Sequence, residues 1–326
     1  MTAGLAPRFM PRAAYRQVAA AGVRFSLYRA DPPRRRRTTP ALLLHGVPQT
    51  AVCWRELLPE LAGDRIVLAP DLKGLGGSEA VGRYDVSTLV RELAALVLHE
   101  VDGPVDVVGH DWGGVLALDL AGARPDLVRR LVVVAAPAGK VNPLRALHVP
   151  LFDLPLLPEA MFGLSGRSLV AAMLRAGWKS PTALEPAVAR HYVEAYAAQA
   201  RVRAMLAYYR DNTRPRLRPL LAAAGRRAVR AGGPARNVQV ERHLVVWGAG
   251  DPVLPISVGE SVVRSLGPDT TLVTVPRAGH FVVEEAPAVV VPAIAGFLRE
   301  EGGPRSRPLP DSAAVATQAD DGRAGG

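Results

Sequence analysis

The chain has 326 residues, 49% of them hydrophobic, which is enough for one large buried core with an inserted block. No stretch approaches the roughly 18 uncharged apolar residues that a membrane-spanning helix needs, and the amino terminus lacks the apolar segment of a secretory signal. The single cysteine, Cys53, excludes an internal disulfide, so we expect a cytoplasmic protein.

The net charge of +10 raises the question of nucleic-acid binding. All but three of the 40 basic residues are arginine, an imbalance that indicates codon bias rather than a binding surface. The basic residues are dispersed apart from 34–37 and the stretch 214–236, and no zinc-finger or RNA-binding motif accompanies them. We therefore expect no nucleic-acid partner and interpret 34–37 as a solvated loop.

Short runs of β-branched residues alternate with helical patterns, which predicts a mostly parallel sheet flanked by helices. A hairpin is expected first, because Ala20-Ala21-Gly22 separates two strand patterns. The hairpin spans 15–19 and 23–29, the following strands span 41–45, 66–69, 105–109 and 131–135, and the helices span 54–62, 86–100 and 112–124.

After Pro137 the strand signals disappear until about residue 240. Helices are predicted there at 166–176, 185–199 and 201–212, followed by strands at 243–247 and 271–275 and a helix at 288–299. We therefore predict an α/β core in two parts, 1–137 and 241–301, interrupted by a helical cap at 138–240. Residues 302–326 contain few large apolar side chains and predict a disordered tail.

The segment 105–114 reads Val-Asp-Val-Val-Gly-His-Asp-Trp-Gly-Gly, a strand pattern followed by Gly-x-Asp-x-Gly and a helix pattern. It matches the nucleophile elbow, with Asp111 where serine is usual. So tight a turn needs small residues, which Gly109, Gly113 and Gly114 supply. The turn would present the aspartate at the carboxyl end of the strand, where α/β sheets bind ligands. An aspartate that only caps the next helix is the alternative.

Two backbone amides are candidates for an oxyanion hole. Residues 45–48, His-Gly-Val-Pro, end an earlier strand and resemble the loop that supplies one such amide. The donors would be the N–H groups of Val47 and Trp112. We interpret His45 as a buried structural residue.

An acid and a histidine follow the last two predicted strands. Asp251 lies in a Gly/Pro turn after strand 243–247, and His280 comes just after strand 271–275. The order nucleophile, acid, histidine along the chain is that of the α/β-hydrolase fold.

Together these motifs resemble α/β-hydrolases of the epoxide hydrolase and haloalkane dehalogenase branch, closest to the soluble-type epoxide hydrolases. The resemblance covers about 15–137 and 240–300, and the loop 71–78 shares it. It implies an α/β-hydrolase fold with an inserted helical cap and a catalytic triad.

An aspartate nucleophile narrows the chemistry. A carboxylate is suited to displacement at saturated carbon, where it forms an alkyl ester, and Asp111 is ionised at neutral pH without a base. His280, oriented by Asp251, is then free to activate the water that hydrolyses the ester. The substrate must therefore offer an electrophilic saturated carbon with a leaving group, and the two obvious choices are an epoxide and a carbon–halogen bond.

In the predicted cap, residues 207–212 read Ala-Tyr-Tyr-Arg-Asp-Asn and resemble the segment in which a tyrosine before arginine donates to the epoxide oxygen. By that match Tyr209 is the expected donor, against the alternative of a tyrosine used for packing. The family usually has a second, earlier cap tyrosine, and Phe152 occupies that region here. Tyr192 or Tyr196 could project inward instead.

Two features argue against haloalkane dehalogenase activity. Val47 stands where typical haloalkane dehalogenases have a second halide donor, and Trp112 stands where fluoroacetate-type enzymes carry arginine. We therefore predict hydrolysis of an epoxide to a vicinal diol. The alternatives are haloalkane dehalogenation and a non-catalytic or diverged scaffold.

The remaining expectations concern the ligand. No metal-ligand cluster and no dinucleotide-binding motif is present, so no cofactor is expected. The expected partner is a small, apolar epoxide, and the sequence is compatible with a homo-oligomer. The candidate substrate-binding side chains are Trp112, Phe152, Trp178, Tyr208 and Phe281.

Overall fold

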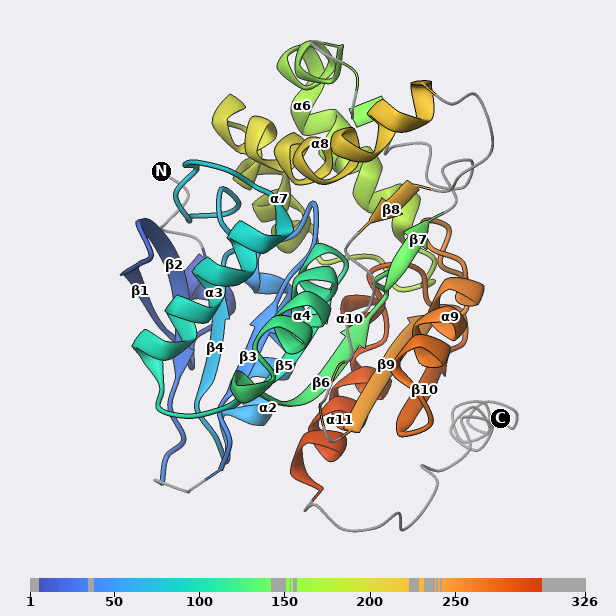
Figure 1. The fold of residues 1–326 in the computed structure, drawn as a ribbon. Helices are drawn as coiled ribbons and strands as arrows, with labels where there is room; N and C mark the ends of the chain where they lie inside the picture. Colours follow the sequence, from blue (N-terminus) through green and yellow to red (C-terminus); the bar gives the residue numbers. More distant parts are fainter. Residues whose placement is uncertain are drawn as a thin grey trace, which may run out of the picture.

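The computed structural model describes residues 6–34, 38–141, 151–152, 154, 157–222, 229–231, 238, 240 and 242–300. Eight strands form one sheet in the order β1-β2-β4-β3-β5-β6-β9-β10 (Figure 1). Their bounds are β1 Ala14–Ala20, β2 Val23–Ala30, β3 Ala41–Leu44, β4 Val67–Pro70, β5 Val105–His110, β6 Val128–Val134, β9 Arg242–Gly248 and β10 Thr270–Val275.

Strand direction fixes where a site can lie. β1 and β2 pair antiparallel, and β2 is antiparallel to β4, whereas all pairs from β4 to β10 are parallel. The carboxyl ends of six strands therefore share one edge of the sheet. This arrangement confirms the predicted mostly parallel α/β fold and the opening hairpin.

Helices cover the sheet. α3 packs on α4, and α2 packs on α11. Strands β3, β4 and β5 are buried along their whole length, as expected for parallel strands covered on both faces. The helices are α1 Ala6–Phe9, α2 Leu57–Leu61, α3 Val86–Glu100, α4 Trp112–Ala123, α9 Ile256–Leu266, α10 Val282–Glu285 and α11 Pro287–Arg299, with 3-10 turns η1 Ala51–Trp54 and η2 Pro125–Leu127.

Three longer helices, α6 Leu157–Gly177, α7 Pro186–Ala195 and α8 Gln199–Ala222, lie together beyond one end of the sheet (Figure 1). The prediction that this inserted block lacks strands is wrong. β7 Gly139–Val141 pairs antiparallel with β8 Val229–Ala231. Each is three residues long and its partner is about 90 residues away, so local periodicity could not reveal the pair.

Three further details of the sequence interpretation need correction. The predicted helix 54–62 divides into η1 and α2, and α9 was not predicted. α6 begins nine residues before its predicted start at Gly166, because Gly163 and Gly166 weaken the local helix pattern while packing of the helix overrides it. The predicted tail 302–326 lies outside the described residues.

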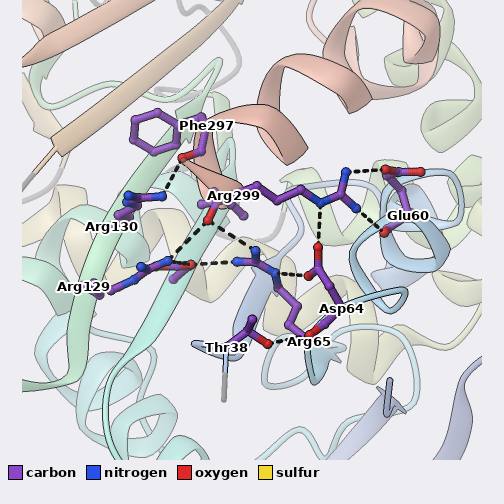
Figure 2. A network of polar contacts seen from close by, with 10 residues as sticks. Thr38, Glu60, Asp64, Arg65, Arg129, Arg130, Phe297 and Arg299 are labelled. Atoms are coloured by element: carbon purple, nitrogen blue, oxygen red, sulfur yellow. Dashed lines mark hydrogen bonds and ion pairs between the residues drawn. The ribbon is translucent and has the colours of Figure 1, made fainter. Parts of the chain in front are cut away.

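An arginine network binds the last turn of α11 at the amino-terminal ends of the parallel strands (Figure 2). Arg65 and Arg129 both bind the carboxylate of Asp106, at 2.9 and 2.5 Å. Arg130 donates to the carbonyl of Phe297 in the last turn of α11, at 2.7 Å. Positive side chains at the carboxyl end of a helix donate to its free carbonyls and interact favourably with the negative end of its dipole.

Candidate active site

Asp111 stands at the sharp turn between β5 and α4. Its φ of 49° lies in the left-handed region that non-glycine residues rarely adopt. A Cβ on Gly109 would lie 2.3 Å from the Gly113 carbonyl oxygen, and one on Gly113 would lie 2.1 Å from the Leu44 carbonyl oxygen. The strained turn is therefore allowed by glycines that bring three backbone segments into contact, as an elbow requires.

The loop after β3 holds one oxygen of this carboxylate. The N–H of Val47 donates to Oδ1 of Asp111 at 2.9 Å. A Cβ on Gly46 would lie 2.4 Å from Cβ of Asp111, so the loop can approach only because this residue is glycine. The N–H of Trp112 belongs to the first residue of α4, directly after Asp111 in the chain.

His280 lies between two carboxylates. Its Nε2 is 3.5 Å from Oδ2 of Asp111, and its Nδ1 is 2.9 Å from Oδ2 of Asp251. The other oxygen of Asp251 accepts the N–H groups of Val253 and Leu254, at 2.8 Å each, which fixes the acid. The three side chains expected from the sequence thus form one connected chain of polar contacts.

Charge and burial oppose one another here. Burial favours neutral His280, but Asp251 and Asp111 outweigh it and raise the pKa of the imidazole from 6.5 to about 10. Burial likewise disfavours the Asp111 carboxylate, yet its bonds to His280 and Val47 bring the pKa below 3.8. The resting pair is therefore a carboxylate facing an imidazolium.

Two supports of His280 were not identified from the sequence. His110 Nε2 bonds the backbone carbonyl of His280 at 2.9 Å, and burial lowers the His110 pKa to about 4, so the ring is neutral and donates. The N–H of His280 donates to the carbonyl of Gly177, the last residue of α6, at 2.8 Å. His110 sits in the elbow motif, whose strand-end position was the only available signal.

Tyr209 lies on α8 with its side chain buried. Its ring meets Trp112 edge-on at 5.3 Å and Phe152 at 5.0 Å. Burial first, and then the charge of Asp111, raise the pKa of the phenol, while a side-chain hydrogen bond from Trp112 opposes the rise. Tyr209 therefore retains its proton and lies within the electrostatic field of the carboxylate.

The other tyrosines of this region differ in where their hydroxyls point. Tyr208 donates to the Lys73 carbonyl at 2.9 Å and Tyr192 donates to Glu284 at 3.0 Å. Tyr196 donates to the Gln49 carbonyl at 3.2 Å, and its pKa is raised by burial and then by Tyr209, Asp71 and Asp111. Of the two inward candidates, Tyr196 is the one influenced by Asp111.

The remaining predicted pocket residues are spread out. Phe281 packs against His280 at a ring distance of 5.3 Å, and the ring of Tyr208 lies 5.5 Å from Trp112. Trp178 is half-buried, and its indole N–H donates to the Thr182 carbonyl within its own loop. None of its described contacts joins it to the triad.

His45 has the structural environment expected for it. Its Nε2 accepts the N–H of Leu72 at 2.9 Å, its Nδ1 lies 2.8 Å from the Gly46 carbonyl, and burial lowers its pKa to about 4. Among the described residues, no three His, Cys, Asp or Glu side chains gather as metal ligands would. In the same part of the chain, no helix is both long and apolar enough to cross a membrane.

This fold and elbow define a protein class. The model of the alpha/beta hydrolase family matches residues 41–293. The chain belongs to that family and is a hydrolase.

Two known proteins and one solved structure are similar to this chain over most of its length. A protein of the AB hydrolase superfamily from Bacillus subtilis, YfhM, is 27% identical over 277 residues, covering 80% of this chain and 90% of its own. Epoxide hydrolase 3 of Xenopus tropicalis is 28% identical over 277 residues, covering 80% and 71%. The solved structure of the epoxide hydrolase CorEH superposes with a TM-score of 0.71 at 25% identity, covering 87% and 98%.

Proposed function

We propose that this chain hydrolyses an epoxide to a vicinal diol through a covalent alkyl ester on Asp111. The observation that carries the proposal is a carboxylate at the elbow, Asp111, which faces His280 at 3.5 Å, with buried Tyr209 packed on the adjacent Trp112. A serine there would favour acyl transfer, whereas a carboxylate favours displacement at saturated carbon. The similarity to epoxide hydrolases over most of the chain supports the same substrate class.

In the first half-reaction, Oδ2 of Asp111 attacks a ring carbon while Oδ1 stays bound to the Val47 N–H. The ring C–O bond breaks, and Tyr209 gives its proton to the departing oxygen. A phenol with a raised pKa retains its proton until an alkoxide, a stronger base, develops beside it. The products of this step are the ester and a phenolate.

The second half-reaction depends on the charge lost in the first. Esterification neutralises Asp111 and removes one of the two charges that raise the pKa of His280. The imidazolium can then return a proton to the Tyr209 phenolate through solvent and become a base. It takes a proton from water, whose oxygen attacks the ester carbonyl while the amides of Val47 and Trp112 hold the oxyanion.

The tetrahedral intermediate then breaks its bond to the diol oxygen. The proton of the new carboxyl group goes to that oxygen, so the diol leaves and Asp111 is again a carboxylate beside imidazolium His280. One epoxide and one water are consumed for each diol, with no net change in protons.

We propose that residues 138–240 act as a cap that shields this chemistry. Tyr209 belongs to α8, and the Asn212 amide of the same helix donates to the Tyr84 carbonyl of the core at 2.9 Å. The edge-on packing of Tyr209 against Trp112 and Phe152 supports an apolar substrate.

The test is incubation of the purified protein with aryl and alkyl epoxides and haloalkanes in ¹⁸O-water, followed by product analysis and intact mass. Diol formation, with ¹⁸O entering Asp111 over several turnovers, is the expected result. Halide release with alcohol formation would indicate a dehalogenase instead. Neither product and no adduct would contradict the proposal.

A further inference from the structure

Glu285, at the end of α10, has an unusual set of partners. Its side chain is buried, and its carboxylate accepts four backbone N–H groups. These come from Lys179 at 2.7 Å, Ser180 at 2.7 Å and Gly279 at 2.8 Å, all to Oε2, and from Phe281 at 3.0 Å to Oε1.

The four donors belong to two segments that are a hundred residues apart. Gly279 and Phe281 flank His280, whereas Lys179 and Ser180 are the second and third residues after α6. One carboxylate therefore ties the segment 177–180 to the segment 279–281.

The segments 177–180 and 279–281 are in close backbone contact. The His280 N–H donates to the Gly177 carbonyl at 2.8 Å. A Cβ on Gly279 would lie 2.2 Å from that carbonyl oxygen, and a Cβ on Gly177 would lie 2.6 Å from Cε2 of Phe281. A shift of the segment 177–180 would thus be transmitted to the backbone of His280.

The carboxylate is chemically specific for this task. Hydrogen bonds from N–H groups to an ionised carboxylate are stronger than neutral ones, and two carboxylate oxygens offer about four acceptor sites. An amide at this position would turn one acceptor into a donor and leave a buried N–H without its partner.

We propose that Glu285 is a positioning residue for hydrolysis of the alkyl ester, because it fixes His280 relative to the segment 177–180. This inference rests on the function proposed above. Alkylation depends on Asp111 and Tyr209, which are held by the elbow and by α8. Hydrolysis depends on His280, and a misplacement of about 1 Å can cost roughly 100-fold in rate.

The test measures the two half-reactions separately. Wild-type enzyme and Glu285→Gln are mixed with the epoxide that the wild-type protein hydrolyses fastest. Rapid quenching and intact mass then give the rate constants for formation and decay of the ester. The matched control is Glu92→Gln, which also removes a buried carboxylate, one that binds Lys73 at 2.7 Å instead of either segment.

We expect the ratio of formation to decay rate constants to rise about tenfold in Glu285→Gln and to stay at the wild-type value in Glu92→Gln. An equal loss in both steps, or an unchanged ratio, would overturn the inference. Should Glu285→Gln fail to fold, Gly177→Ala, which presses on Phe281, must raise the same ratio.

His280→Gln separates the two levels of the argument. If this variant accumulates ester while Glu285→Gln keeps the wild-type ratio, only the role of Glu285 fails. If no epoxide of the panel yields an ester on His280→Gln, the proposed function fails and the role of Glu285 with it.

Discussion

The Val47 N–H binds Oδ1 of Asp111 at 2.9 Å, so one oxygen of the carboxylate is committed before any substrate arrives. In the proposed mechanism Oδ2, the oxygen that faces His280, is the one left to react. The same amide can later hold the ester carbonyl without moving, which is the pre-organisation that stabilises an oxyanion.

Gly46→Ala tests that arrangement. The added Cβ would lie 2.4 Å from Cβ and 2.7 Å from Oδ1 of Asp111, so the loop or the carboxylate must move. We expect a loss of at least about 100-fold in kcat/KM and a destabilisation of about 1–3 kcal/mol. Steady-state kinetics and urea unfolding measure both. Wild-type activity of Gly46→Ala would show that the loop can move without loss of function, against this prediction.

Replacement of the nucleophile should abolish turnover. Asp111→Ala removes the atom that forms the ester, and we expect a rate below roughly 1/1,000 of the wild-type value for every epoxide. Circular dichroism provides the folding control. A folded variant that still makes diol would contradict the covalent mechanism.

Tyr209→Phe should slow ring opening and leave ester hydrolysis nearly unchanged. The variant keeps the ring against Trp112 and Phe152 but lacks the acidic proton. Loss of a general acid corresponds to roughly 100-fold or more in the alkylation rate constant. Tyr208→Phe is the matched control, since that hydroxyl donates to the Lys73 carbonyl. If Tyr209→Phe and Tyr208→Phe slowed alkylation equally, the assignment of Tyr209 as the proton donor would be wrong.

The pKa of His280 predicts a pH dependence of stability. The value rises from 6.5 to about 10 on folding, so the protonated side chain stabilises the folded state fully below pH 6.5. Between pH 6.5 and 10 the unfolded chain loses the proton first, and this contribution fades. The free energy of unfolding of wild type relative to His280→Gln should therefore fall over that window, by an amount on the order of a few kcal/mol. Urea titrations of both proteins at pH 6, 8 and 10 measure this difference. If the free energies of unfolding of wild type and His280→Gln changed in parallel with pH, the prediction would be wrong.

Much of the fold could be predicted because its signals are local. α3 was predicted at 86–100, where it is found, because its apolar spacing is contiguous in sequence. The proximity of Asp111, Asp251 and His280 could also be predicted, because each follows a parallel strand and those ends share one edge.

What could not be predicted depends on contacts between distant segments. Neither the β7–β8 pair nor the four amides on Glu285 leaves a periodic trace in the sequence. The bond from His110 to the His280 carbonyl joins residues 170 apart. Backbone partners are especially hidden, since any residue type can supply an N–H or a carbonyl.

The arginines around the last turn of α11 determine where Glu300 lies. Arg130 lies near the start of β6 and donates to the backbone carbonyls of Phe297 and Glu300. Glu300 therefore lies at the amino-terminal ends of the strands, opposite the strand ends where Asp111 lies. A surface linkage or a fused domain placed directly after Glu300 would therefore start on the side of the sheet away from Asp111.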